Sequence, residues 1–489
     1  MRSGACRDRI PGESMLWTCL NLPDLPLAVF ARGAASETPA VVASATHRPD
    51  VVVANAAAGK RGITPGLSIA AALALDPELT IHLRDERAES HALKGIALWA
   101  GQWTSTVSIE PPDCVLLEIS ACRNYFGGLD KLLARIDAGL AAIGFSGTLA
   151  TAPTAGAASL FARAGQAIIA AEDSAWTRRL GALPLAFLAS AQTALDTLSG
   201  IGVRTLGELT ALPRDGVARR FGQALLDEVD RARGLLPDPR LPFLPPQRYH
   251  GQLELPAPVV EVEALLFAVK RLVAELAGFL HGRGAGVTQL RCDLVHEDAA
   301  PTSLVFGLSC TRQVEHILNV LRERLARTEL PDRVEAIRIV TEEIAPLGAK
   351  AGDFFPIAGG DGEAGAQLLE RLRARLGEDA VRALELRADH RPERASGQTA
   401  PTGAATMPAQ ARSSFALRPL WLLATPRPLG SDPALSGLKL LSGPERIETG
   451  WWDGEDIGRD YFVGRNPQGE ELWLYRERAG GWFMHGVFA

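Results

Sequence analysis

One acidic side chain in this sequence stands where a metal-binding carboxylate could do chemistry. Asp113 follows the Pro111-Pro112 turn and precedes the apolar run 114–119, so it marks the start of a strand. A carboxylate presented in this way can bind Mg²⁺, the ion used in nucleotidyl transfer. That chemistry needs a second carboxylate beside the first, and the neighbour here is Cys114. The residues therefore indicate the framework of a transfer site that has lost its catalysis.

Neither of two other acidic residues is expected to replace the missing carboxylate. Glu118 lies five residues further along the strand, about 16 Å away at the rise of an extended chain. Asp24 lies beyond Pro23 and should face elsewhere. For Asp113 itself, a simple role as a turn-capping residue is an alternative. We expect no bound metal and no cofactor.

Composition indicates a globular protein of several domains. Its 489 residues exceed what one hydrophobic core holds, so we expect three or four domains. The net charge of −6 gives no general attraction to polyanions, so any nucleic-acid surface must be a local basic patch. Nearly all the basic residues are Arg, with only six Lys, which a GC-rich genome would explain.

The cysteines and the N-terminal residues bear on location. The six Cys are scattered and form no CxxC pair, which favours a reducing cytosol and no zinc site. No apolar run reaches the ~18 residues of a membrane span. Residues 1–14 are polar and charged, so we expect a disordered extension without an export signal, and Met15 is an alternative start. A cytoplasmic protein is therefore expected.

Strands and helices alternate through the first third of the chain, which predicts an α/β domain over residues 15–175. The long amphipathic patterns predict helices at 86–105, 129–143 and 155–170. Short apolar runs predict strands at 16–21, 41–45, 51–55, 114–119 and 145–152.

This domain resembles the palm and fingers of the Y-family translesion DNA polymerases. Within that family the chain is most similar to the catalytically inactive, polymerase-like subunit of the bacterial mutasome. The resemblance implies a multidomain α/β and α+β architecture of palm and fingers, helix-hairpin-helix thumb, little finger and a small Trp-rich β domain. The motifs that carry it are Asn55, Gly62-Ile63, Gly66-Leu67, Ala71 and Pro77, then Ile109-Glu110, Asp113, Leu117-Glu118-Ile119 and Phe126-Gly127-Gly128.

The departures from the family pattern fall on its catalytic positions. Active members hold two Mg²⁺ ions with three carboxylates, and these positions fall on Asn21, Asp113 and Cys114. Asn is a poor ligand for a hard dication and Cys is a soft one. The family's other functional residues are replaced too: its triphosphate-binding Tyr and Arg by Ala56 and Gly59, its steric gate by Pro26 and a triphosphate-facing Lys by Ser159.

The thumb is expected over residues 176–236. Its run 198–209 resembles a helix-hairpin-helix, in which backbone N–H groups of a Gly-x-Gly turn approach a DNA phosphate. The DNA-contact candidates that follow are Gly200, Gly202, Arg204 and Thr205. An ordinary glycine turn between two helices is the alternative.

A Pro-rich tether over 237–250 leads to a little finger over 251–346. The pattern strand-helix-strand-strand-helix-strand resembles the domain with which the family grips the DNA backbone. Its expected elements are 253–255, 261–280, 287–296, 302–309, 311–328 and 334–342. Arg283, Arg291 and Arg338 are candidates for phosphate contacts, and each could equally be a solvated surface Arg.

Residues 347–393 are expected to hold a clamp-binding motif followed by a helical and β extension. Asp353-Phe354-Phe355 resembles the end of a sliding-clamp peptide, although the usual Gln falls on Ala351. Local packing of the two Phe is the alternative. The run 252–255 also resembles such a peptide, but it should begin the little finger's first strand. His390 beside Asp389 has no nearby nucleophile and is interpreted as structural.

The C-terminal part has a different composition. Residues 394–415 are poor in apolar residues, so we expect a disordered linker. Residues 416–489 should form a small β domain, with strands at 438–441, 447–452, 460–463, 472–475 and 482–488. Trp473 and Trp482 are expected in its core, whereas Trp421, Trp451 and Trp452 are candidate partner anchors.

The sequence therefore predicts a non-catalytic scaffold for translesion DNA synthesis. The resemblance implies four partners: primer-template DNA, the sliding clamp, an ImuA-like protein of the RecA family and the error-prone replicative-type polymerase ImuC. Its place would then be the cytoplasm, with nucleoid association when bound to DNA. Two alternatives stay open, an active translesion polymerase with an unusual metal site and an adaptor that binds only proteins.

Overall fold

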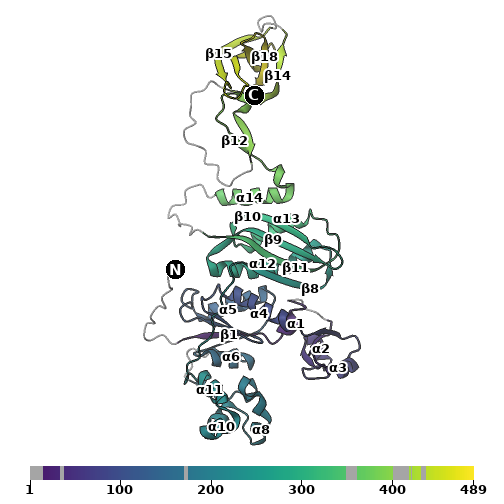
Figure 1. Cartoon of the computed structure of the whole chain (residues 1–489), viewed down its shortest axis with the longest axis vertical. Coiled ribbons are helices and arrows are strands. Elements are labelled where there is room, and N and C mark those ends of the chain that lie inside the picture. The colour runs from purple at the N-terminus through teal and green to yellow at the C-terminus, as the bar shows by residue number, and fades with distance from the viewer. Residues whose placement is uncertain are drawn as a thin grey trace. The chain divides into compact units, whose positions relative to one another are not determined.

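The computed structural model describes residues 15–32, 38–169, 175–347, 361–399, 418–419, 421–430 and 437–488. By their internal contacts the residues divide into two compact units, Met1–Phe354 and Phe355–Ala489 (Figure 1). The expected N-terminal extension 1–14 and the motif Asp353-Phe354-Phe355 lie outside the described residues. None of the described helices is both long enough and apolar enough to cross a bilayer.

The first unit is built around an antiparallel palm sheet in the strand order β5-β6-β1-β7. Both of its faces are covered, because successive strand side chains point to opposite sides. Leu20 packs toward α4 and α5, and Cys19 packs toward α6. The elements are β1 (Trp17–Asn21), β5 (Val107–Glu110), β6 (Cys114–Glu118), β7 (Thr148–Ala152), α4 (Glu86–Ala100), α5 (Leu129–Ala142) and α6 (Ala155–Arg163).

Local sequence explains where the palm helices begin. The Asp85 carboxylate accepts hydrogen bonds from the N–H groups of Arg87 and Ala88 and so caps α4. The Thr154 hydroxyl accepts from the N–H of Ala157 at the start of α6. These caps fix the two helices that flank the sheet, and α6 is the helix that reaches the candidate site.

The fingers form a small separate layer on a three-stranded sheet in the order β3-β2-β4. Its core is small and includes Val41, Ala58 and Ile63. Asn55 caps α2 by accepting a hydrogen bond from the N–H of Ala58. The elements, with the short helix that leads to them, are α1 (Leu25–Ala28), β2 (Ala40–Ala43), β3 (Val51–Ala54), α2 (Ala56–Lys60), α3 (Ile69–Leu75) and β4 (Thr80–Leu83).

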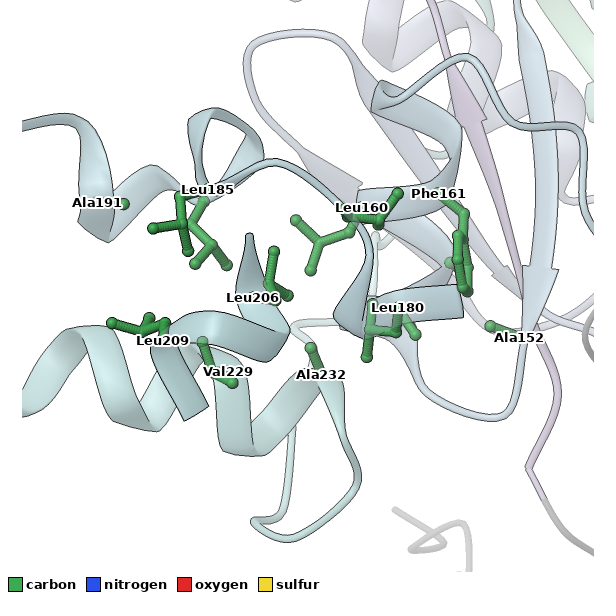
Figure 2. Close-up of a cluster of buried hydrophobic side chains, with 14 of the residues drawn as sticks. Ala152, Leu160, Phe161, Leu180, Leu185, Ala191, Leu206, Leu209, Val229 and Ala232 are labelled. Atoms are coloured by element: carbon green, nitrogen blue, oxygen red, sulfur yellow. The ribbon is translucent and has the colours of Figure 1, made fainter. Parts of the chain in front are cut away.

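The thumb is a group of short helices that shares its core with α6. Figure 2 shows Leu160 and Phe161 of α6 near apolar side chains of the thumb, among them Leu180, Leu206, Leu209, Val229 and Ala232. This shared core attaches the thumb to the palm. Its elements are α7 (Trp176–Gly181), η1 (Leu185–Phe187), η2 (Ala189–Ala194), α8 (Leu195–Gly200), α9 (Leu206–Thr210), α10 (Arg214–Phe221) and α11 (Gln223–Ala232).

The little finger has the expected order of strands and helices. Its sheet runs β10-β9-β11-β8, all pairs antiparallel. Buried residues at every second position of β9, such as Leu290 and Cys292, give the sheet one buried face. The elements are β8 (His250–Val259), α12 (Val262–Arg283), β9 (Ala285–His296), β10 (Thr302–Thr311), α13 (Val314–Leu325) and β11 (Val334–Pro346).

Helix α12 also packs closely against α4 of the palm. A Cβ atom added to Gly278 would lie 2.5 Å from the Trp99 ring, so only glycine fits there. The contact also buries an ion pair, with Arg32 Nη2 2.5 Å from Glu275 Oε2. Both side chains are less than a tenth exposed. Because removing one partner of such a pair strands a buried charge, this contact ties α12 to the palm.

The second unit contains a hairpin and an antiparallel five-stranded sheet in the order β14-β18-β17-β16-β15. Ile447, Tyr461, Trp473 and Tyr475 form its core. Its elements are α14 (Asp361–Leu376), η3 (Glu378–Ala380), β12 (Ala383–Leu386), η4 (Pro392–Arg394), β13 (Ser396–Thr399), β14 (Trp421–Leu429), β15 (Lys439–Thr449), β16 (Ile457–Arg465), β17 (Glu471–Glu477) and β18 (Trp482–Val487).

Three expectations for this unit are wrong. Residues 396–399 were assigned to the linker but form β13, which pairs with β12. The runs 438–441 and 447–452 are one strand, β15, and it ends at Thr449. Trp451 and Trp452 therefore lie in the turn before β16 rather than on a strand. The strand β14 was missed, because its alternation is interrupted by Pro426 and Pro428. The rest of the expected linker, 400–415, lies outside the described residues.

Breaking the buried pair should destabilise the attachment of α12 to the rest of the first unit. We expect Arg32→Ala to cost about 3–5 kcal/mol, because Glu275 keeps a buried charge without its partner. Hydrogen exchange of the α12 amides in the full chain measures this loss. The control is Arg48→Ala, an exposed position that should change stability by less than ~0.5 kcal/mol. Equal exchange in the two variants would show that the ion pair does not support the contact.

Candidate functional site

Hairpin β5–β6 and strand β1 bring three polar side chains into one row. Glu110 pairs with Cys114 across the hairpin, and Cys114 pairs with Asn21 on β1. Directly paired residues project to the same face, so all three point toward α6. The Cys114 thiol lies 3.4 Å from Asn21 Oδ1 and 3.4 Å from Asp113 Oδ1. The expected vestigial positions Asn21, Asp113 and Cys114 therefore do lie together.

A guanidinium group occupies the space between the two carboxylates of this site. Arg163, the last residue of α6, places Nη1 3.0 Å from Glu110 Oε1 and Nη2 3.4 Å from Asp113 Oδ1. Burial by itself lowers the pKa of Arg163, but the neighbouring Cys114, Glu110 and Asp113 outweigh it and raise the pKa. Arg163 is therefore a permanent cation at the position between the carboxylates.

A second guanidinium reaches the same site from the tether. Arg240 Nη1 lies 2.5 Å from Glu110 Oε2, and its Nη2 lies 2.7 Å from Asp238 Oδ2. Ser159 donates a 2.7 Å hydrogen bond to the other oxygen of Glu110. Both oxygens of Glu110 are therefore engaged by residues of this chain.

The donor set does not fit a pair of Mg²⁺ ions. Together these residues line a cavity of about 760 Å³ between palm, thumb and tether. Asn21 lines the cavity with an amide, the Cys114 thiol beside it is fully buried, and Arg163 would repel a dication. Burial raises the pKa of the neighbouring Cys19 thiol. In the part of the chain that the structure describes, no three His, Cys, Asp or Glu side chains are grouped to bind a metal.

Sequence reasoning missed Glu110, Arg163 and Arg240. The expectation that Asp113 is the one acidic side chain of the site is wrong, because Glu110 reaches it from the other arm of the hairpin. A signal was present: three residues separate Glu110 from Cys114, a turn length that places them opposite each other. Nothing local in the sequence indicates the two arginines. Arg163 is 50 positions from Asp113, and Arg240 is 130 positions from Glu110.

The other replaced family positions are spread over the palm and fingers. Ser159 belongs to the site, through its bond to Glu110. Pro26 is buried in α1, and Ala56 and Gly59 lie on α2 of the fingers. None of these three lines the cavity with Arg163.

In the expected DNA-binding hairpin of the thumb, the backbone N–H groups already donate hydrogen bonds within the thumb. The N–H groups of Ile201, Gly202 and Val203 donate to carbonyls of α8. The N–H groups of Arg204 and Thr205 donate to the Glu208 carboxylate, which hydrogen bonds hold at a lowered pKa. A phosphate at these N–H groups would have to displace that carboxylate. Gly200 and Gly202 are exposed, and their DNA contact stays a prediction.

The three expected arginines of the little finger already have partners. Arg291 lies 2.8 Å from Glu342 and 3.3 Å from Asp293. Arg338 donates a 3.0 Å hydrogen bond to Gln252, and Arg283 donates to the carbonyl of Pro246. Because Gln252 lies inside β8, the run 252–255 is part of the sheet, as expected. The phosphate contacts of these arginines also stay a prediction.

The three candidate partner anchors of the second unit are all exposed. Trp451 is 81% exposed, Trp421 73% and Trp452 56%, so none of these rings belongs to the core of the second unit. By contrast Trp473 is buried, as expected, and Trp482 is half-buried against Phe462. The binding role of the three exposed Trp stays a prediction.

The turn that carries Trp451 and Trp452 is held by a buried arginine. Arg391 lies 2.7 Å from Asp389 and 2.6 Å from Asp453, and its guanidinium faces the Trp452 ring at 6.0 Å. Hydrogen bonds from Arg391 lower the pKa of Asp389 to about 2. Asp389 therefore has the structural role expected for it, whereas His390 is exposed.

Comparisons with known proteins agree with the predicted resemblance. Residues 32–163 match the impB/mucB/samB family. The chain is 27% identical over 459 residues to Protein ImuB from two strains of Caulobacter vibrioides, covering 87% of this chain and 100% of each relative. Solved structures with a similar fold include DinB from Sulfolobus solfataricus, at 16% identity and a TM-score of 0.39, covering 67% of this chain and 98% of that one. A Y-family DNA polymerase chimera of Dbh and Dpo4 matches at 17% identity and the same TM-score, covering 68% and 100%. The predicted resemblance and fold class are confirmed.

Protonation of Asp389 at acid pH should weaken its ion pair with Arg391, which holds the turn that carries Trp451 and Trp452. Its pKa is lowered from 3.8 to about 2, so its contribution to stability is fully present above pH 3.8 and is lost as the pH falls through about 2. We expect Asp389→Asn to make the thermal unfolding of the second unit less dependent on pH in this window. The control is Asp456→Asn, an exposed carboxylate near the same turn. An identical pH dependence in wild type and Asp389→Asn would contradict the assignment.

Proposed function

Because the chain is similar to ImuB and contains a match to the impB/mucB/samB family, we propose that it is a non-catalytic Y-family polymerase homologue that serves as a scaffold for translesion DNA synthesis. In this role it acts in SOS-type damage tolerance and mutagenesis, at damaged DNA in the cytoplasm. It holds primer-template DNA, the sliding clamp and a second, error-prone polymerase in one assembly.

The observation that carries the proposal is the guanidinium of Arg163 between Glu110 and Asp113. Strand extension in this family needs two dications held by carboxylates, which activate the primer hydroxyl and bridge the triphosphate. Here a fixed cation already lies between the two carboxylates, and the nearby amide and thiol of Asn21 and Cys114 are poor ligands for Mg²⁺. Without a binding site for the two metal ions, the palm keeps its fold but cannot catalyse strand extension.

The rival function is an active translesion polymerase with a non-standard metal site. One observation favours it: three of the carboxylates that line the cavity, those of Glu110, Asp113 and Asp238, contact Arg163 or Arg240. Rotation of Arg163 and Arg240 out of the cavity would free them. That movement would break four charged contacts, so the inactive form is favoured.

Charge favours the thumb over the little finger as the surface that binds DNA. Residues 251–347 carry ten Lys and Arg against fourteen Asp and Glu, which repels phosphate overall. Residues 175–236 carry eight Arg against six acidic residues. Arg204, Arg219 and Arg220 of the thumb are exposed. We therefore assign the main phosphate contacts to the thumb and a smaller share to Arg283, Arg291 and Arg338.

The remaining partners are assigned by resemblance and by exposure. The motif Asp353-Phe354-Phe355 is proposed to bind the sliding clamp. Exposed Trp421, Trp451 and Trp452 are proposed to anchor an ImuA-like RecA-family protein or the polymerase ImuC. A protein-only adaptor remains the outcome if DNA binding fails.

Purified protein should not extend a primer. We expect no incorporation with Mg²⁺ or Mn²⁺, and no difference between wild type and Asp113→Ala, because the metal pair has no binding site. A primer-extension assay with an active Y-family polymerase as the positive control measures this. Incorporation by the wild type that Asp113→Ala abolishes would establish the rival function.

Binding to primed DNA should depend on salt mainly through the thumb. Replacing Arg204, Arg219 and Arg220 together by Ala should weaken binding roughly tenfold or more, and each lost phosphate contact should reduce the salt slope by about 0.7–0.9. Arg291→Ala is the matched control and should change little, because Asp293 and Glu342 already pair with that side chain. A larger effect of Arg291→Ala would move the main contact to the little finger. DNA binding that does not change with ionic strength would contradict phosphate contacts and favour the adaptor that binds only proteins.

A further inference from the structure

The tether between thumb and little finger lies on the palm in an extended form. The Phe243 N–H donates a 2.7 Å hydrogen bond to the carbonyl of Val107 on β5. The Ser108 hydroxyl donates a 2.8 Å bond to the carbonyl of Leu241. The tether therefore adds a short segment to the free edge of the palm sheet.

Backbone and apolar contacts can hold this segment only weakly. Residues 237, 239, 242, 245 and 246 are all proline, and proline has no N–H to donate. Leu241 is 88% exposed and Leu244 82%, so Phe243 is the residue of this run that packs against the palm core. The attachment must therefore depend on side-chain charge.

Two charged residues of the tether supply that attachment. Arg240 bridges Glu110 of the palm and Asp238 of the tether, and its side chain is about four-fifths buried. Asp238 also accepts a 3.2 Å hydrogen bond from the N–H of Gly156 at the start of α6. Glu110 is held in turn by Arg163 and Ser159. The contacts thus form one chain of charges from the tether to α6.

From these contacts we propose that the former metal cavity is a guanidinium-binding joint, which fixes the tether to the palm. Glu110 is the central acceptor: one of its oxygens binds Arg163 from α6 and the other binds Arg240 from the tether. Four carboxylates and three guanidinium groups line the cavity, so its charge is nearly balanced without an ion from solution. The joint sets where the connection to the little finger leaves the palm, and it does not depend on DNA, clamp or partner binding.

Arg240 suits this task better than a lysine would. Its two terminal nitrogens reach two different carboxylates at once, Glu110 through Nη1 and Asp238 through Nη2. A single ammonium group presents a point charge and cannot match that fork. The geometry therefore specifies a guanidinium and not only a positive charge.

The test is hydrogen exchange of the Phe243 amide in the full-length protein. We expect Arg240→Ala to raise its exchange rate about tenfold, because the segment then opens locally without its charged contacts. Arg240→Lys should give a smaller rise, and Glu110→Gln should behave like Arg240→Ala. Added guanidinium ion at millimolar concentration should slow exchange again in Arg240→Ala, whereas sodium ion at the same ionic strength should not.

The control is Arg248→Ala, at an exposed arginine near the end of the tether that does not line the cavity. It should leave the exchange of Phe243 unchanged. An unchanged rate in both Arg240→Ala and Glu110→Gln would overturn the joint. Faster exchange of the β1 amides to the same degree would also overturn it, because Arg240 would then support the whole palm. Rescue by sodium would reduce the site to a general charge effect and contradict its specificity for guanidinium.

Discussion

The arrangement of this protein depends on the guanidinium of Arg163 between Glu110 and Asp113. Two carboxylates at the end of one hairpin repel each other unless a cation lies between them. In a metal-dependent polymerase that cation comes from solution with the substrate, so it comes and goes with each turnover. An arginine on α6 is permanent. The acidic end of this hairpin therefore forms a fixed contact between β5, β6 and α6.

Replacement of an ion by a side chain also changes how the domains are connected. A metal ion binds whatever oxygens surround it, whereas an arginine brings its own segment of chain to the site. Arg163 brings α6, on which the thumb packs, and Arg240 brings the tether. The buried pair of Arg32 and Glu275 does the same for α12 and the segment that follows α1. Fixed links thus join palm, thumb, tether and little finger, which suits the proposed role as a scaffold.

The second unit is built on different interactions. Its core is small and includes Tyr461, Trp473 and Tyr475. Three further large apolar side chains, those of Trp421, Trp451 and Trp452, stay exposed outside this core. Residues 389–399 are attached to the turn before β16 through Arg391 and Asp453, although residues 394–399 were expected to belong to a linker. Composition failed there because one buried arginine with two carboxylates holds a segment that has almost no apolar side chains.

The sequence by itself determined the fold class, the order of strands and helices in the little finger, and the amide and thiol at Asn21 and Cys114. These features follow from local periodicity, turn residues and residue type, which a linear pattern contains. Only the tertiary structure decided that Glu110 joins Asp113, that Arg163 and Arg240 fill the cavity, and that the little-finger arginines are already paired. The reason is that an ion pair forms between side chains brought together by folding, and their separation in the sequence carries no information about that distance.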